Sequence, residues 1–133
     1  MKICIIDDDP ICHFIAKKMI GNVFSQSELS HFYNGQKAIE FFKEKQYAPS
    51  ELPELILVDI NMPVMDGWNF LSMLDKLAIQ CYDPGIFICS SSDNTEDLNK
   101  AKVIPAVHGY ITKPLNVNAL KNVLENIVSL AVC

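Results

Sequence analysis

The feature that most constrains the fold is an alternation of short apolar runs with longer stretches of helical period. Five short apolar runs occur along the chain, and each is followed by a longer segment expected to be a helix, of which the fourth, from about Thr95 to Lys102, is polar. Such alternation is typical of βα units around a parallel sheet. The expected strands are Lys2–Ile6, Leu29–Tyr33, Leu55–Val58, Ile86–Cys89 and Val107–Thr112. The sequence therefore predicts an α/β fold made of five such units.

The predicted helices have recognisable starts. Pro10 is a favoured first helical residue, and the helix that it opens is expected to end near Gly21. Asn34 and Asn116 can each cap the helix that follows them. In the first helix, the stripe expected to face the core is Ile11, Phe14, Ile15 and Met19. In the second and third, it is Ala38, Ile39 and Phe42, and then Phe70, Leu71, Leu74 and Leu77.

Length and composition exclude several classes of protein. The chain has 133 residues, the size of one domain, and a net charge of -5 without a basic cluster, so direct binding of nucleic acid is not expected. It has no apolar stretch of membrane-spanning length and no signal-peptide pattern, so we expect a cytoplasmic protein that does not enter a membrane. The cysteines, predicted to be reduced core thiols, are Cys4, Cys12, Cys81, Cys89 and Cys133.

Polar residues gather where the expected strands end. Parallel strands joined by right-handed crossovers all end at one edge of the sheet, and ligands bind in the crevice there. The residues at these ends are Asp7, Asp8 and Asp9 after the first strand, Asp59 after the third, Ser90 and Ser91 after the fourth, and Lys113 after the fifth. The sequence therefore predicts a cluster of carboxylates, hydroxyls and one ammonium.

These residue types point to phosphoryl chemistry. Converging carboxylates repel one another unless a cation lies between them, and an all-oxygen ligand set suits Mg²⁺. Lys113 and Ser90 could then contact the oxygens of a phosphoryl group in transfer. Asp59, the lone acid at the end of a central strand, is the candidate nucleophile that would form an aspartyl phosphate. The spacing alone does not identify the phosphoryl donor.

Four motifs in register carry a family resemblance. IIDDDP, DINMPVMDG, the serines after IFIC, and GYITKP occur in this order, and together they resemble the receiver domain of two-component response regulators. The resemblance spans the chain and implies a flavodoxin-like, doubly wound sheet of strand order 2-1-3-4-5 with helices on both faces. It also implies that residues 1–133 form a single domain of the stand-alone type, because no output domain follows the last helix.

The resemblance also assigns roles to the site residues. Asp59 matches the phosphoacceptor, and Lys113 matches the lysine that pairs first with that aspartate and then with the phosphoryl group. Among the Mg²⁺ ligands, Asp8 matches the direct one, Asp7 the one that acts through water, and Asn61 the one that contributes its backbone carbonyl. The peptide bond between Lys113 and Pro114 is expected to be cis.

The remaining roles concern switching. Ser90 matches the switch hydroxyl, although a slip of one residue to Ser91 stays open, and Tyr110 matches the aromatic switch residue on the last strand. Asp9 matches no chemical role and is expected to be a helix cap or a solvated charge. The three histidines, His13, His31 and His108, show no ligand pattern and are expected to have structural or surface roles.

The resulting functional hypothesis is a phosphorylation-activated switch. A partner histidine kinase or histidine phosphotransfer protein would supply the phosphoryl group, and a downstream protein would read the face made by the fourth helix, fifth strand and fifth helix. The domain would assist only its own phosphorylation and dephosphorylation, and would be a monomer or weak dimer. Two alternatives are kept open. One is an aspartate-nucleophile phosphohydrolase, suggested by Asp7-x-Asp9, and the other is an interaction module that works without phosphorylation.

Overall fold

The protein is an α/β sandwich with one central parallel sheet. The computed structural model describes the backbone of residues 1–23, 25–91 and 94–131, and the side chains of that range up to 123 and at 125. The strands are β1 (Lys2–Ile6), β2 (Glu28–Phe32), β3 (Leu55–Val58), β4 (Gly85–Ser90) and β5 (Val107–Thr112). The helices are α1 (Pro10–Val23), α2 (Gly35–Glu44), α3 (Gly67–Leu77), α4 (Thr95–Lys102) and α5 (Val117–Ala131), with a short 3-10 helix, η1, at Pro49–Glu51.

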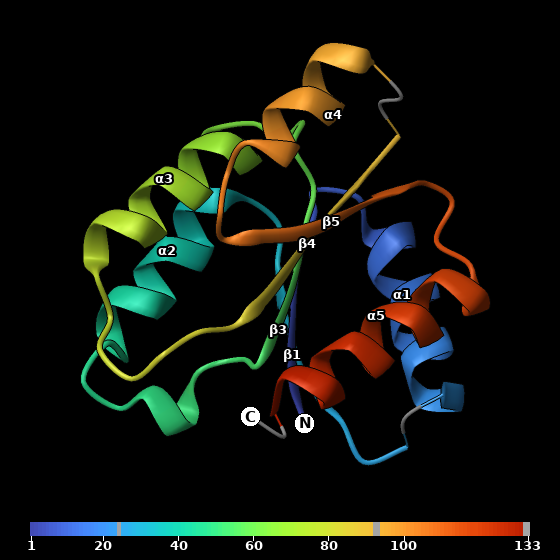
Figure 1. Cartoon of the computed structure of the whole chain (residues 1–133), viewed down its shortest axis with the longest axis horizontal. Coiled ribbons are helices and arrows are strands. Elements are labelled where there is room, and N and C mark those ends of the chain that lie inside the picture. The colour runs from blue at the N-terminus through green and yellow to red at the C-terminus, as the bar shows by residue number, and fades with distance from the viewer. Residues whose placement is uncertain (24, 92–93, 132–133) are drawn as a thin grey trace.

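The strand order confirms the predicted fold. The sheet runs β2-β1-β3-β4-β5, and the neighbouring strands are parallel. Figure 1 shows α1 and α5 together on one side of the sheet and α2 and α3 together on the other. The predicted strands lie within one residue of the observed bounds. Since the strands are parallel, their carboxyl ends share one edge of the sheet. The strand order changes direction between β1 and β3, and ligands typically bind at the carboxyl edge at such a point.

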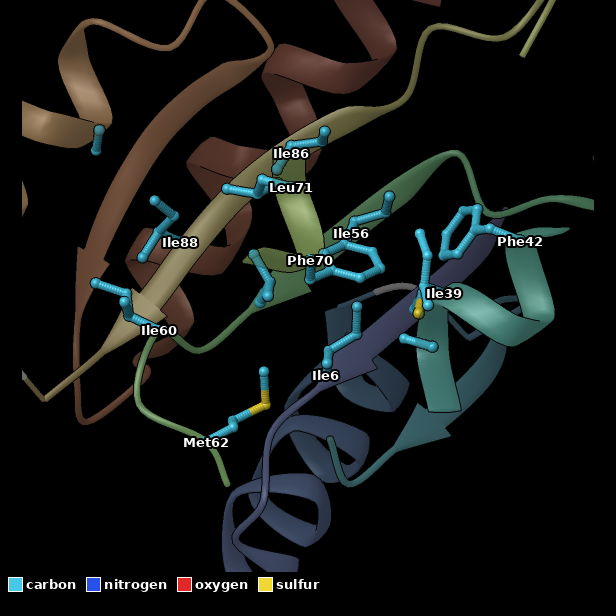
Figure 2. Close-up of a cluster of buried hydrophobic side chains, with 14 of the residues drawn as sticks. Ile6, Ile39, Phe42, Ile56, Ile60, Met62, Phe70, Leu71, Ile86 and Ile88 are labelled. Atoms are coloured by element: carbon cyan, nitrogen blue, oxygen red, sulfur yellow. The ribbon is translucent and has the colours of Figure 1, made fainter. Parts of the chain in front are cut away.

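The larger core lies between the sheet and helices α2 and α3. Alternate residues of the inner strands point to it, as expected for a pleat of period two. Figure 2 shows side chains of the strands meeting Ile39 and Phe42 of α2 and Phe70 of α3. The aromatic rings of Phe42 and Phe70 lie 5.7 Å apart between centroids. The stripes predicted for α2 and α3 are therefore confirmed: Ala38, Ile39, Phe42, Phe70 and Leu71 are buried, and Leu74 and Leu77 are partly buried against the core.

The second core lies between the sheet and helices α1 and α5. It shows that the face of α1 predicted to be buried was wrong. The residues of α1 that are buried are His13, Ala16 and Ile20, whereas Ile11 is 66% and Phe14 61% exposed. Met19 is only partly buried. Helix α1 is apolar over most of its circumference, so periodicity alone does not identify its inner face. A buried histidine fixes the rotation instead, because its ring nitrogens find hydrogen-bond partners beneath the helix.

Several helix starts are capped as the sequence predicts. The side-chain oxygen of Asn34 accepts a hydrogen bond from the amide of Lys37 at 2.8 Å, and that of Asn116 accepts one from Ala119 at 2.8 Å. Asp9 caps α1, since its carboxylate accepts from the amide of Ile11 at 2.9 Å. These caps satisfy first-turn amides that would otherwise lack a partner, at the edge of the sheet where the strands end.

The cysteine prediction holds only in part. Cys4 and Cys89 are buried thiols, Cys12 is half-buried, and Cys81 is exposed, so Cys81 is not a core residue. Burial raises the pKa of Cys89 to about 12, which leaves it protonated and inert at neutral pH. Cys133 lies outside the described residues. Within the described ranges, no helix is long and apolar enough to cross a membrane.

Candidate functional site

The site begins with the ends of two adjacent strands. In the sheet register Ile6 of β1 lies opposite Val58 of β3, so the residues that follow them, Asp7 and Asp59, are neighbours. The amide of Asp59 donates to the carbonyl of Ile6 at 2.9 Å, which extends the ladder by one step and fixes this placement. Both aspartates are buried, at 4% and 7% exposure. The predicted juxtaposition of these two acids is confirmed.

Lys113 directly follows the edge strand β5, and its ammonium contacts both acids. Its Nζ lies 2.5 Å from Oδ2 of Asp7 and 3.3 Å from Oδ2 of Asp59. The amide of Lys113 donates to the carbonyl of Ser90 at 2.8 Å, and the bond to Pro114 is cis, as predicted. One ammonium thus bridges two buried carboxylates that come from β1 and β3.

Asp8 completes an acidic triad that suits a hard cation. Carboxylate oxygens of Asp7, Asp8 and Asp59 lie within 4.8 Å of one another, and Asp8 is exposed while the other two are buried. Three carboxylates exceed the charge of a single ammonium, so the pocket is net negative. Oxygen donors at this spacing, with one side open to solvent, fit a hard divalent cation that retains waters. The triad is consistent with a metal site.

Burial shifts the pKa values of Asp59 and Lys113 in opposite directions, and the charge of each residue acts against the effect of burial on the other. Burial raises the pKa of Asp59, and the neighbouring Asp7 carboxylate adds to this effect, whereas the Lys113 ammonium partly offsets it. Burial alone would lower the pKa of Lys113, but the hydrogen bond that its ammonium donates to Asp7 and the charge of Asp59 raise it above its ordinary value. Lys113 is therefore charged throughout the neutral range, and it places a positive charge beside two buried carboxylates.

Backbone amides orient the acids. The amide of Asp9 donates to Oδ1 of Asp7 at 2.9 Å, and that of Asn61 approaches Oδ1 of Asp59 at 3.4 Å. These donors leave the other oxygen of each carboxylate directed to Lys113. Asn61 is exposed on the turn after β3. Its role as a carbonyl ligand stays a prediction.

Gly67 allows the turn after β3 to fold back onto Asp59. Its amide donates to the carbonyl of Ile60 at 2.9 Å, at the first residue of α3. A Cβ at this position would overlap the Asp59 carbonyl oxygen and lie 2.9 Å from the Cα of Ile60. The absence of a side chain at Gly67 is therefore what lets helix α3 start against the backbone of Asp59.

The two serines at the end of β4 differ in placement. Ser90 is fully buried at the last position of β4, whereas Ser91 is exposed. Ser91 lines a cavity of about 340 Å³ that also borders Asp7, Asp59 and Lys113. Tyr110 is half-buried on β5, paired in register with Ile88. The switch roles of Ser90 and Tyr110 stay predictions, and so does the alternative at Ser91.

Sequence reasoning missed two residues beside the pocket. Cys12 lies in the wall of the same cavity, with its thiol 3.6 Å from Oδ2 of Asp9. His13 is buried, and its Nε2 lies 2.7 Å from the backbone oxygen of Asp7. The available signal was their position: both fall in the first turn of the helix that follows the aspartates, and first-turn residues lie close to the strand end that precedes them.

A doubly wound parallel sheet with this acidic pocket is typical of proteins that accept a phosphoryl group on an aspartate. The chain belongs to the response regulator receiver domain family, whose model matches residues 3–125. The family consists of phosphoacceptor regulatory modules rather than enzymes that turn over an outside substrate, in agreement with the sequence prediction. Membership also implies a histidine kinase partner.

Individual relatives agree with this assignment. The chain is 25% identical over 130 residues to the chemotaxis protein CheY of Halobacterium salinarum, covering 96% of this chain and 97% of that protein. It is 26% identical over 124 residues to the probable C4-dicarboxylate response regulator DctR of Bacillus subtilis, covering 93% of this chain but only 50% of that protein. The chain thus spans nearly all of one relative and half of the other.

Solved structures share the fold. A two-component response regulator from Cytophaga hutchinsonii has a TM-score of 0.82 and 29% identity, with 96% of each chain covered. The BeF3-activated DrrB receiver domain has a TM-score of 0.70 and 19% identity, with 96% of this chain and 97% of that chain covered. These similarities agree with the observed strand order.

The raised pKa of Asp59 predicts that Asp59→Asn stabilises the metal-free protein at neutral pH. The native state binds the Asp59 proton more tightly than the unfolded state, so wild-type stability falls as pH rises through the two pKa values. Asparagine removes this fall, and we expect a gain of roughly 1 kcal/mol at pH 7 that disappears near pH 3. Urea unfolding of both proteins across this pH range, without Mg²⁺, measures the difference. A wild type that is the more stable protein at pH 7 would contradict the prediction.

Proposed function

We propose that the chain is a phosphorylation-activated signalling switch whose phosphoacceptor is Asp59. The observation that carries this proposal is the bridge made by Lys113, which holds its ammonium against both Asp7 and Asp59. A lysine in this place neutralises the nucleophile before reaction and remains within reach of an incoming phosphoryl group. The continuous five-stranded sheet supports treating residues 1–133 as one domain.

The proposed reaction is transfer from a phosphohistidine of a kinase or phosphotransfer protein. A carboxylate oxygen of Asp59 attacks phosphorus, the bond from phosphorus to the imidazole nitrogen breaks, and the electron pair returns to the imidazole. Asp8, with Asp7 through water and the carbonyl of Asn61, would hold Mg²⁺. Bound Mg²⁺ supplies positive charge to the phosphoryl oxygens. Lys113 would contribute a second positive charge through its ammonium, which contacts Asp7 and Asp59.

The proposed signal is a shift in population at the face of α4, β5 and α5. In the unphosphorylated state Ser90 is buried at the end of β4, and Tyr110 is half-buried on the adjacent strand. A new hydrogen bond from Ser90 to the phosphoryl group would move β4 and leave room for Tyr110 to turn inward. A downstream protein would read the altered face.

Acetyl phosphate provides a direct test without the partner kinase. With Mg²⁺, we expect mass spectrometry to show one added phosphoryl group on wild-type protein, located at Asp59, and none on Asp59→Asn. Beryllofluoride should give the same change in Trp68 fluorescence as phosphorylation, since Trp68 directly follows Gly67 at the start of α3. Wild type and Asp59→Asn that behave alike, with no Mg²⁺-dependent change, would overturn the proposal.

Two further variants separate the proposal from its alternatives. Hydrolysis of a generic phosphate ester that survives Asp59→Asn but is lost in Asp7→Asn would favour a phosphohydrolase. Ser90→Ala and Ser91→Ala form a matched pair for the switch hydroxyl. We expect only Ser90→Ala to uncouple phosphorylation from the fluorescence change, because Ser90 is the residue at the last position of β4. The opposite result would assign the role to Ser91.

A further inference from the structure

A pair of histidines, one buried and one half-buried, adjoins the acidic pocket. His13, on α1, is 4% exposed. Its Nε2 lies 2.7 Å from the backbone oxygen of Asp7, and its Nδ1 lies 2.8 Å from Nδ1 of His31 on β2. The ring of Tyr33 covers His13 at 4.6 Å between centroids. Helix α1, the edge strand β2 and the end of β1 are therefore connected through one imidazole.

The hydrogen-bond partners of His13 restrict where its protons can lie. A carbonyl oxygen only accepts, so Nε2 of His13 carries a proton and donates it to Asp7. Two imidazole nitrogens at 2.8 Å need a single proton between them. Burial, together with the nearby His13 and Lys17, lowers the pKa of His31. Donation from Nδ1 of His31 leaves Nδ1 of His13 as the acceptor and Nε2 of His13 as the donor to Asp7.

The carbonyl that His13 holds belongs to the peptide between two acids of the pocket. The oxygen of Asp7 and the amide of Asp8 share one rigid plane, so fixing that oxygen also fixes the start of Asp8. The amide of Asp7 donates to Phe32 of β2 at 3.0 Å. Both backbone groups of Asp7 are therefore held, one by the sheet and one by the histidine.

The geometry points to His13 as a positioning residue of the pocket, which orients the Asp7–Asp8 peptide so that both carboxylates face Asp59. This inference rests on the proposed function, because it concerns the affinity of the acidic triad for Mg²⁺ and the reactivity of Asp59. Removing a group that hydrogen-bonds to a metal ligand and orients it typically lowers metal affinity by about 10- to 100-fold. His31 supports His13 by keeping its donor on Nε2.

Nitrogen-15 NMR of the imidazoles tests the proton placement in metal-free protein at pH 7.5. We expect His13 to be protonated on Nε2 and His31 on Nδ1. In His31→Phe, which keeps a ring but removes the donor, His13 should lose its single tautomer. A wild-type His13 that carries its proton on Nδ1, or that averages between tautomers, would overturn the inference.

Mg²⁺ titration and acetyl phosphate kinetics test the functional consequence. We expect His13→Leu to weaken Mg²⁺ binding by about tenfold and slow phosphorylation. His13→Gln keeps an amide donor near the Nε2 position, so its affinity should stay within about threefold of wild type. The control is Ile20→Ala, which empties a buried site near the other end of α1 and should lower stability while leaving Mg²⁺ affinity unchanged.

The outcomes separate this inference from the proposed function. Wild-type protein that shows no response to Mg²⁺ would overturn both. Wild-type protein that binds Mg²⁺ with the same affinity as His13→Leu would overturn only the positioning role. If His13→Leu does not fold, His31→Phe carries the test, with an expected weakening of about threefold, and unchanged affinity there would overturn the inference.

Discussion

Replacing Lys113 by methionine is expected to slow phosphorylation by acetyl phosphate about 100-fold and to lower the free energy of unfolding by about 3 kcal/mol at pH 7. The variant removes the ammonium that lies 2.5 Å from Asp7 and 3.3 Å from Asp59, and methionine keeps most of the aliphatic volume. Two buried carboxylates are then left without their cation. Urea unfolding and mass-spectrometric time courses measure the two effects.

The pH and metal dependence of this loss has a definite sign. The folded-state pKa of Lys113 is raised, so its contribution is complete at neutral pH and is lost only in strongly alkaline solution. In the Lys113→Met protein, acidification should restore stability by protonating the carboxylates, and Mg²⁺ should restore part of it at pH 7. The matched control is Lys45→Met, which breaks an exposed pair with Glu51 at 3.5 Å and should cost under about 1 kcal/mol. Equal losses in the two variants would contradict the proposed role of Lys113.

Replacing Gly67 by alanine is expected to destabilise the protein by about 3 kcal/mol and to weaken Mg²⁺ binding. The new Cβ would collide with backbone atoms of Asp59 and Ile60, which cannot move without displacing Asp59, the proposed phosphoacceptor. Gly67 has no positive φ, so the cost is steric rather than conformational. Urea unfolding with and without Mg²⁺ measures both consequences.

Gly21 offers a control for this substitution. A Cβ at Gly21 meets nothing within 4 Å, and the residue lies inside α1. Alanine is favoured over glycine within a helix by about 0.5–1 kcal/mol, so Gly21→Ala should be neutral or stabilising. If Gly67→Ala were equally harmless, the close approach of α3 to Asp59 would not constrain the pocket.

The sequence was sufficient for the sheet because its signals are local and repeated. Runs such as Leu55–Val58 are buried on both faces, which makes them uniformly apolar, and the acids that follow them sit where parallel strands end. The sequence alone therefore predicts that Asp7 and Asp59 lie together. Helices α2 and α3 each have one apolar stripe and one polar face, so their buried faces could be predicted equally well.

The features that escaped prediction depend on two or more elements at once. The rotation of α1 is decided by His13, whose burial becomes acceptable only because β2 brings His31 to its other nitrogen. No pattern in the sequence indicates that His13 and His31 pair. Hydrophobic periodicity predicts the wrong face of α1, because Ile11 and Phe14 are apolar but exposed. Likewise, the clash that excludes a side chain at Gly67 arises from a strand and a helix meeting, which no periodicity records.

The 106 positions that separate Asp7 from Lys113 have a consequence for the protein during its synthesis. The ribosome releases β1, β3 and all three acids of the pocket before it has made the lysine. A nascent chain therefore presents the three carboxylates of the acidic triad without the ammonium of Lys113, and β5 must join the sheet before the two groups can meet. We therefore expect the proposed phosphorylation to depend on β5, so chains that stop before Lys113 should carry the acidic residues but should not accept a phosphoryl group from a kinase.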